Sequence, residues 1–167
     1  QVYEGLVTHD IGMNIQPQLA TSWESTDPET WVFKLREGVT FHDGSPFTAS
    51  DAAFSIIRAK TDPSDMVDLI KSIKSAKAID DTTLEIKTEG PNPILLNQLV
   101  QIFIMSESWA KEMGCEVSYN WDAGESSKCA SAANGTGPFK ITLREQDIRT
   151  IFERNTDWWG DQSQHNI

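Results

Sequence analysis

The residues able to do chemistry in this sequence are three histidines, two cysteines and many carboxylates, and their spacing defines no catalytic centre. His42 and Asp43 are neighbours, so on an extended chain their side chains point to opposite sides and do not converge on one ligand. His9 and His165 lie near the two ends, without acidic or cysteine partners at the spacing of a zinc site. We therefore expect no metal site, and we attribute Asp43 to a turn with Gly44.

Motifs of the main enzyme classes are also missing from the sequence. It contains no Gly-x-Ser-x-Gly, no lysine phosphate loop, no His-Glu-x-x-His and no dinucleotide-binding glycine pattern. Carboxylates are numerous enough to supply a glycosidase-like pair, but no pair stands out from that abundance. We expect no catalytic residues and no cofactor, and an acidic hydrolase is the weakest of the functional hypotheses.

Two short segments are candidates for the core or for contact with another molecule. Residues 101–105, Gln-Ile-Phe-Ile-Met, have the apolar majority of a buried strand. Residues 135–137, Gly-Thr-Gly, precede a strand, so they lack the helix that a phosphate cradle needs. The glycines favour a close approach of two backbones, a hinge, or a plain turn with Asn134.

Two cysteines, Cys115 and Cys129, enclose a polar segment rich in Ser, Gly and Glu, a composition typical of a loop. Three interpretations of this cysteine pair are open. The pair forms a disulfide if the protein is exported, it consists of two unrelated free thiols, or it binds a metal, for which no histidine or third cysteine lies nearby.

The elements that must position these residues are clearest before residue 60. Residues 19–26 and 30–36 predict two strands joined by a turn at Pro28, with Trp31, Phe33 and Leu35 facing the core.

The clearest helix is predicted over residues 49–60. Thr48 and Asp51 resemble a capping box at its start, and Ala53, Phe54, Ile56 and Ile57 are expected on its apolar side. Asp51, Ser55 and Arg58 are expected on the opposite side.

Further elements follow the same hydrophobic periodicities. Residues 1–8 predict a helix end leading into a strand, and residues 114–136 predict a long polar loop. Helices are predicted at 65–71, 93–100 and 106–113, and strands at 73–79, 82–88, 102–105, 139–143 and 148–153. Because the strands are mostly local hairpins with helices inserted, we predict an α+β fold with a mixed, mostly antiparallel sheet.

Composition narrows the possible partners. The chain has 167 residues, 25 acidic and 14 basic, and a formal net charge of −11. This charge disfavours nucleic acid and anionic membrane surfaces. No apolar run reaches the roughly 18 residues that a membrane span needs.

Six stretches, taken in order, resemble one protein family. They are residues 2–7 (VYEGLV), 16–24 (QPQLATSWE), 31–51 (WVFKLREGVTFHDGSPFTASD), 76–86 (AKAIDDTTLEI), 135–139 (GTGPF) and 153–160 (ERNTDWWG). Each stretch is short, but they occur in the same order as in the family and are spread across nearly the whole chain. They resemble the extracellular solute-binding proteins of family 5, the receptors of peptide, nickel and oligosaccharide ABC importers.

The resemblance implies a fold and a domain organisation. Family members have the two-lobed architecture of type II periplasmic binding proteins, and their lobes close over a ligand. This chain is similar to a fragment of lobe one, with core parts at about 1–40 and 135–160 and an appended subdomain at about 41–134. The second lobe is expected to be absent.

The resemblance also implies a function. The expected protein is the substrate-binding component of an ABC importer, which captures a peptide, chelate, sugar or opine and delivers it to an inner-membrane permease. It is expected to be monomeric and periplasmic or otherwise extracytoplasmic, with a lipid anchor as one option. An exported location favours the disulfide between Cys115 and Cys129.

By position, residues 101–105 match a family segment whose side chains face the ligand, and residues 135–137 match a signature near the interlobe region. The ligand-binding candidates are therefore Gln101, Phe103, Gly135, Thr136 and Gly137.

A different class of function stays open. Trp158 and Trp159 predict packing of the terminal strand, but tryptophan also stacks on sugars. A stand-alone extracellular carbohydrate-binding or adhesion module is therefore the alternative.

Overall fold

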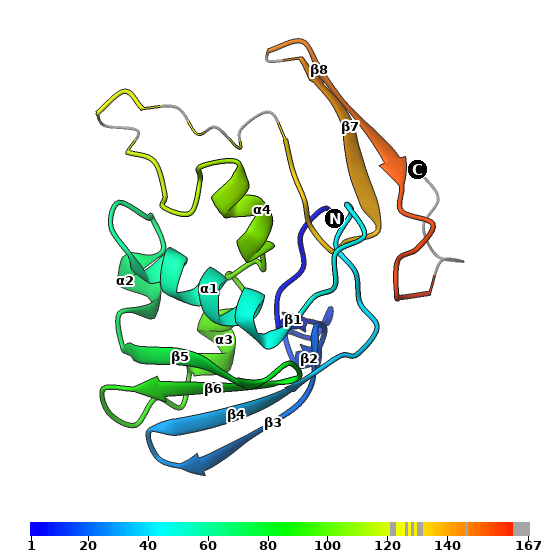
Figure 1. The fold of residues 1–167 in the computed structure, drawn as a ribbon. Coiled ribbons are helices and arrows are strands. Elements are labelled where there is room, and N and C mark those ends of the chain that lie inside the picture. The colour runs from blue at the N-terminus through cyan, green and yellow to red at the C-terminus, as the bar shows by residue number, and fades with distance from the viewer. Residues whose placement is uncertain (121–122, 126, 128, 130–131, 146, 162–167) are drawn as a thin grey trace.

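The computed structural model describes residues 1–120, 123–125, 127, 129, 132–145 and 147–161. Within these residues, short helices are inserted between antiparallel strands, which confirms the α+β class (Figure 1). The elements in chain order are β1 (Val7–His9), β2 (Ile15–Pro17), β3 (Ala20–Asp27), β4 (Thr30–Leu35), α1 (Ala49–Lys60), α2 (Val67–Ile70), β5 (Ile73–Asp80), β6 (Thr83–Thr88), α3 (Leu95–Leu99), α4 (Glu107–Glu112), β7 (Phe139–Glu145) and β8 (Arg149–Arg154).

A four-stranded antiparallel sheet with the order β3-β4-β6-β5 forms the centre of the fold. Its strands follow the alternation of the sequence, because Phe33 and Leu35 of β4 are buried while Lys34 between them is exposed. Trp31 is only half buried and packs against the edge of the core. Phe33 lies directly opposite Leu84 of β6, which is also fully buried, so the β4–β6 pair contributes to the centre of the core.

This sheet joins parts of the chain that the family resemblance assigns to different units. β3 and β4 precede residue 40, whereas β5 and β6 lie within residues 41–134. Nevertheless, β4 and β6 are hydrogen-bonded neighbours in one sheet. The division into a lobe-one core and an appended subdomain stays a prediction. The sheet spans its first boundary, near residue 40, because β4 and β6 lie on opposite sides of that boundary in sequence.

Helix α1 has the predicted limits, but its buried face differs from the prediction. Asp51 forms the capping box with Thr48, whose backbone N–H and hydroxyl each lie 2.9 Å from one Asp51 carboxylate oxygen. Asp51 and Ser55 are buried, whereas Ile57 is 40% exposed, so the predicted arrangement of faces is wrong at these positions.

The buried polar residues of α1 have backbone partners that the sequence pattern does not show. The second Asp51 carboxylate oxygen accepts the Glu107 backbone N–H at 2.9 Å, at the start of α4. Ser55 accepts the Met105 backbone N–H at 2.9 Å. Burial of these side chains is therefore compensated by hydrogen bonds that tie α1 to the segment 105–107.

Three other predicted elements differ from the structure. Residues 1–6 contain no helix. Residues 102–105 form no regular strand, because Phe103 makes only an isolated bridge to Gly5. Helices α2 and α3 are shorter than the predicted 65–71 and 93–100, and neither has a side-chain cap.

Cys115 and Cys129 form a disulfide, which confirms the pairing expected for an exported protein. Their Cα atoms are 6.3 Å apart, within the usual range for a bridged pair. Cys115 follows α4 directly after Gly114, whose φ of 66° ends the helix in the left-handed region that glycine favours. The bridge therefore closes a loop inside the long polar segment, in which the described residues form no helix or strand before β7.

Candidate ligand-binding site

A cavity of about 350 Å³ opens between the N-terminal segment, helix α1 and the segment after α3. Two of the ligand-binding candidates, Gln101 and Phe103, line it. The other lining residues come from the N-terminus, from α1 and its following loop, and from the rest of the segment after α3: Tyr3, Ser55, Arg58, Ala59, Ser64, Met66, Ile102 and Met105. The fold thus brings Gln101 and Phe103 together with side chains from two distant parts of the chain.

Backbone contacts fix the wall that carries Phe103. The Ile104 N–H donates to the Glu4 carbonyl at 2.9 Å, and Gly5 bridges to Phe103. Successive side chains of this extended segment point to opposite sides, so Ile104 is fully buried while Phe103 is 58% exposed. Because Phe103 also lines the cavity, its ring is accessible to a ligand.

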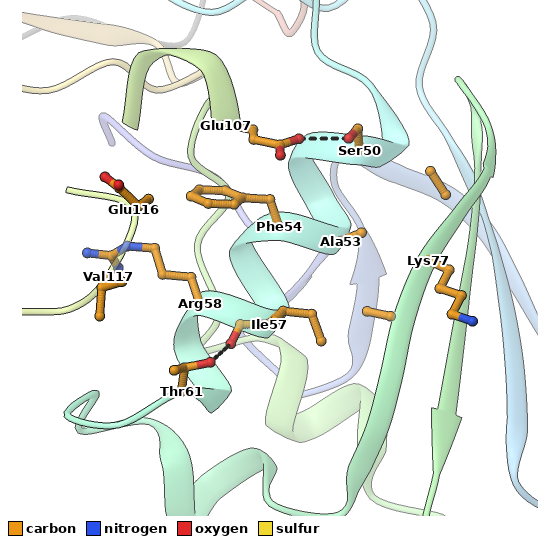
Figure 2. A pocket seen from close by; sticks show the side chains of 12 residues that line it. Ser50, Ala53, Phe54, Ile57, Arg58, Thr61, Lys77, Glu107, Glu116 and Val117 are labelled. Atoms are coloured by element: carbon orange, nitrogen blue, oxygen red, sulfur yellow. Dashed lines mark hydrogen bonds between the residues drawn. The ribbon is translucent and has the colours of Figure 1, made fainter. Parts of the chain in front are cut away.

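Arg58 belongs to the helical wall of the cavity. Its Nε donates to the Cys115 carbonyl at 3.0 Å, which connects α1 to the start of the disulfide loop. Figure 2 shows Arg58 extending from α1 toward Glu116 and Val117 of that loop. Burial lowers the pKa of the Arg58 guanidinium. An arginine nevertheless keeps its charge in a protein.

Tyr3 adds a polar group to the N-terminal wall. Burial raises the pKa of the Tyr3 phenol, and a backbone hydrogen bond from Asn134 and the charge of Arg58 act in the opposite direction. The phenol therefore keeps its proton at neutral pH. Tyr3 thus presents a neutral hydroxyl, which acts as donor and acceptor.

The Gly135-Thr136-Gly137 segment does not line this cavity. A Cβ at Gly135 would collide with the Val2 carbonyl, and one at Gly137 would collide with the Gln1 carbonyl. The Gly137 N–H donates to the Val2 carbonyl at 2.9 Å. The glycines therefore allow the close backbone approach that was one of the sequence readings, directly behind the wall that carries Tyr3.

Glu4 is a buried carboxylate, 3% exposed, beside the same segment. Its Oε2 accepts the Thr136 hydroxyl and the Trp159 Nε1–H, each at 2.9 Å, and its Oε1 accepts the Trp158 Nε1–H at 3.2 Å. Burial raises the pKa of Glu4, and these donors lower it in part. Glu4 therefore fastens the end of the described chain to the N-terminal segment.

The tryptophan pair has a packing role in this network. The Arg36 guanidinium lies 4.0 Å from the centre of a Trp159 ring, in the position of a cation–π contact. Both indole N–H groups are bonded to Glu4. These contacts explain the positions of Trp158 and Trp159 without a bound carbohydrate.

His42 and Asp43 also hold the segment that contains the glycines. The Nε2 of His42 lies 2.9 Å from the Gly137 carbonyl and therefore donates, while Nδ1 accepts the Gly135 N–H at 3.4 Å. Burial lowers the pKa of His42, which favours this neutral form. Asp43 accepts from the Asn134 amide at 2.7 Å. Both side chains thus have structural partners.

The expectation of no metal site can be compared with the described part of the chain. His9 lies 3.2 Å from the amide oxygen of Asn97, and the described residues contain no group of three possible metal ligands. His165 lies outside the described residues.

A second cavity, of about 540 Å³, shares Arg58 with the first (Figure 2). It lies between the outer face of α1, strand β5 and residues 116–117, and it contains none of the ligand-binding candidates. Its polar lining carries both signs of charge, with Lys77 against Glu107 and Glu116. We take the smaller cavity as the candidate site because it alone of the two brings the sequence candidates together.

Sequence reasoning missed Tyr3, Ser55 and Arg58 as members of this site. Ser55 and Arg58 fall on the polar side of a predicted amphipathic helix, which is normally the solvent side. Their spacing of three residues places them on one helical face, which is the only local signal that they act together.

Solved structures share this fold across nearly the whole chain. NikZ from Campylobacter jejuni, in complex with Ni(L-His), has a TM-score of 0.83 at 26% identity, covering 96% of this chain and 31% of that one. The periplasmic binding protein DppA from Helicobacter pylori, in complex with the peptide STSA, has a TM-score of 0.77 at 30% identity, covering 96% and 34%. The described residues thus have a fold that forms about a third of each of these two solute-binding structures.

Sequence comparisons define the family. A putative ABC transporter peptide-binding protein of Brucella ovis is 31% identical over 166 residues, 97% of this chain. The dipeptide-binding protein of Escherichia coli is 30% identical over 186 residues, 98% of this chain. The model of the bacterial extracellular solute-binding proteins, family 5 Middle, matches residues 14–166. The chain belongs to this family, and it spans 30% and 34% of the length of these two relatives.

Proposed function

We propose that this chain is part of the solute-binding receptor of an ABC importer. Membership of family 5 supports the proposal, and the cavity in which Gln101 and Phe103 meet Tyr3 is the observation that carries it. The receptor captures a peptide-like or other small polar solute, such as a chelate, sugar or opine, and delivers it to an inner-membrane ABC permease. No bond is made or broken in this function.

Each candidate residue has a role in the proposal. Gln101 offers an amide and Phe103 an aromatic face to the solute. The Gly135, Thr136 and Gly137 segment supports the cavity wall without contacting the solute. It holds the residues on both sides of Tyr3 in place through hydrogen bonds. The described residues thus form one wall of a cleft, and the remainder of the receptor supplies the other.

An extracytoplasmic location is part of the same proposal. A disulfide such as Cys115–Cys129 persists in oxidising compartments, and a relative from Escherichia coli is a nickel-binding periplasmic protein. In the described chain no helix has the length and apolarity of a membrane span. A monomer fits this function, and a lipid anchor is compatible with it.

The proposal is tested by solute binding to the longest reading frame that contains this chain. Thermal shift with peptides, nickel chelates, opines and sugars identifies a stabilising solute, because specific binding stabilises the native state. Calorimetry then compares Phe103→Ala and Gln101→Ala with Ile94→Ala, an exposed position outside the cavity. We expect roughly 10-fold weaker binding for the first two, the loss of about 1.4 kcal/mol of contact, and an unchanged Kd for the control.

A carbohydrate-binding or adhesion module would give a different result. In that case, binding to immobilised oligosaccharide would depend on Trp158 and Trp159, and Phe103→Ala would leave it unchanged. That outcome would contradict the receptor proposal.

A further inference from the structure

The second cavity, of about 540 Å³, runs along an edge of the central sheet (Figure 2). Strand β5 ends the order β3-β4-β6-β5, so among the described strands it pairs only with β6. Three consecutive residues of β5 line the cavity, Ala76, Lys77 and Ala78. Because successive residues of a strand point to opposite faces, a cavity that touches three in a row includes the edge of the strand. We call this cavity the edge groove.

Small side chains leave the groove open on the helix side of the sheet. Ala76 and Ala78 lie opposite Ile86 and Leu84 of β6, which are fully buried, so the two alanines share the core face of the sheet. An alanine side chain ends at Cβ, and Ala78 is exposed despite facing the helix side. Figure 2 shows Ile57 of α1 directed toward β5 across this space. Helix α1 thus extends over the place where a fifth strand would lie.

The helix side of the groove exposes apolar side chains. Ile57 is 40% exposed and Val117 is 54% exposed, and both line the groove together with Phe54. Arg58 extends toward Glu116 on this side, so neither sign of charge dominates there. Alternate residues of a strand placed next to β5 would point toward α1 and cover this surface. The residues of that strand that face α1 should therefore be apolar.

Strand β5 also has backbone groups available for a further strand. Alternate N–H and C=O groups of an edge strand point away from its partner. In the described part of the chain, residues 74–79 make no backbone hydrogen bond outside the pairing with β6. The register is regular from Ser75 to Ala78 and irregular on both sides of this stretch. An extended segment can add here as a strand, a mode of binding in which main-chain hydrogen bonds give affinity and alternate side chains give specificity.

The charges at this edge favour an acidic strand as the partner. Lys77 is exposed and lies opposite Glu85 of β6, but Glu85 forms its ion pair with Lys87, at 3.6 Å. Neither Lys77 nor Lys74 has an ion pair among the described residues. Cross-strand pairs of opposite charge stabilise a sheet, and like charges destabilise it. Charges farther apart than about 8 Å are largely screened at physiological ionic strength, so these lysines outweigh the net charge of −11 at the edge.

We propose that β5 and the edge groove bind an extended segment of a partner protein in which acidic and apolar residues alternate. The segment pairs with residues 75–78, its apolar side chains enter the groove beneath α1, and its acidic side chains lie beside Lys77. A second copy of this chain fits less well, because its own β5 would bring Lys74 and Lys77 to the same edge. This inference goes beyond the proposed receptor function, since Gln101 and Phe103 do not line the groove.

The first test uses the longest reading frame that contains this chain and the hexapeptide EVEVEV with both termini blocked. Calorimetry measures the Kd, and amide hydrogen exchange measures the protection of residues 75–78. We expect saturable binding that slows the exchange of amides in this stretch. The same peptide with every backbone nitrogen methylated cannot donate main-chain hydrogen bonds, so it should not bind. Absence of saturable binding, or equal binding of the two peptides, would overturn the inference.

The second test separates the edge groove from the candidate ligand-binding site. Ala78→Phe fills the groove, whereas Ile79→Phe changes the next residue, which is exposed and does not line the groove. We expect the Kd of EVEVEV to rise at least about 10-fold in Ala78→Phe and to change by less than about 2-fold in Ile79→Phe, because only the first creates a clash with the bound strand. Phe103→Ala should leave this Kd unchanged. A loss of binding in Phe103→Ala with none in Ala78→Phe would place the peptide in the solute site and overturn the inference.

Charge reversal tests the class of partner. In the wild type we expect EVEVEV to bind roughly 5-fold more tightly than KVKVKV, the upper range for one cross-strand charge pair. Lys77→Glu should reverse this order, whereas Arg149→Glu on β8, outside the groove, should keep it. An unchanged order in Lys77→Glu would rule out the acidic class. A dimer in analytical ultracentrifugation that Ala78→Phe dissociates would assign the edge to a second copy and also overturn the inference.

Discussion

Individual polar residues in this protein connect segments that are distant in sequence. Glu4 joins the N-terminal segment to Trp158 and Trp159, and Asp51 joins the first turns of α1 and α4. Each is a buried carboxylate whose oxygens accept neutral N–H or O–H donors, with no salt bridge to it in the described part of the chain. Burying a carboxylate without hydrogen-bond partners costs free energy. Each of these carboxylates therefore holds its hydrogen-bonded neighbours in place.

The β4 register gives the simplest prediction at this scale. Phe33 is fully buried and Lys34 is exposed. Phe33→Ala should therefore lower the free energy of unfolding by about 3–5 kcal/mol, the range for removing a buried aromatic side chain. Lys34→Ala should change it by less than about 0.5 kcal/mol. Urea unfolding of both variants measures the difference, and reversed magnitudes would mean that the strand faces are exchanged.

Glu4 gives a prediction about pH. Its native pKa lies above the ordinary value of 4.5, so between these two values the native state binds more protons than the unfolded state. The contribution of Glu4 to stability should therefore be largest below about pH 4.5 and should fall as the pH rises through its native pKa. Urea unfolding of the wild type and Glu4→Gln across pH 4–8 measures this contribution as a difference.

The matched comparison makes the Glu4 prediction specific. Other carboxylates, such as Asp43, titrate in both proteins and cancel in the difference. A wild-type-minus-variant difference that is constant with pH would contradict the assignment.

At the scale of elements, hydrophobic alternation and helix caps predicted the limits of β4 and α1 well. Those signals are local, because a capping box and a period of two lie within a few residues. The faces of α1 were harder to predict. Ser55 is buried because Met105, 50 residues away, supplies its partner, and no local pattern contains that information.

The capping box yields a graded prediction. Thr48→Ala should destabilise the protein by about 1 kcal/mol, the usual cost of losing a cap. Asp51→Ala should cost roughly 2–3 kcal/mol, because it also leaves the Glu107 N–H without its acceptor. Chemical unfolding of both variants gives the order, and equal costs would show that the contact with Glu107 adds nothing.

The disulfide loop can be tested by reduction. Thiol titration of the denatured, unreduced protein should find no free sulfhydryl, because Cys115 and Cys129 are paired. A loop of this length stabilises the native state by about 3 kcal/mol in the chain-entropy model. Reduction should therefore lower the Tm measured by circular dichroism. Two titratable thiols would contradict the pairing.

At the scale of the whole molecule, the sequence revealed the family more readily than the site. Gln101 and Phe103 were identified from their place in a family motif, and they do line the cavity. Tyr3 and Arg58 were missed because they join the cavity only when the N-terminal segment and α1 come together with residues 101–105. A cavity wall made from three separate segments is a property of tertiary packing.

The receptor proposal predicts that this chain alone binds the solute weakly or not at all. A cleft between two lobes buries most of its ligand only when both are present, whereas the entropy cost of immobilising the ligand is not halved with the contacts. Calorimetry of this chain and the longest reading frame against the same solute measures the difference, which should far exceed a factor of two. Comparable Kd values would show that these residues hold the complete site.

The contact of the Gly-Thr-Gly segment with the N-terminus has a consequence for the order of assembly during synthesis. The Val2 and Gln1 carbonyls accept their hydrogen bonds from Gly137 and Phe139, so residues 1–2 lack these partners until residues 137–139 have been made. The central sheet needs only residues up to Thr88 and can form earlier. Nascent chains that end before residue 134 should therefore have a folded sheet and a protease-sensitive segment at residues 1–2.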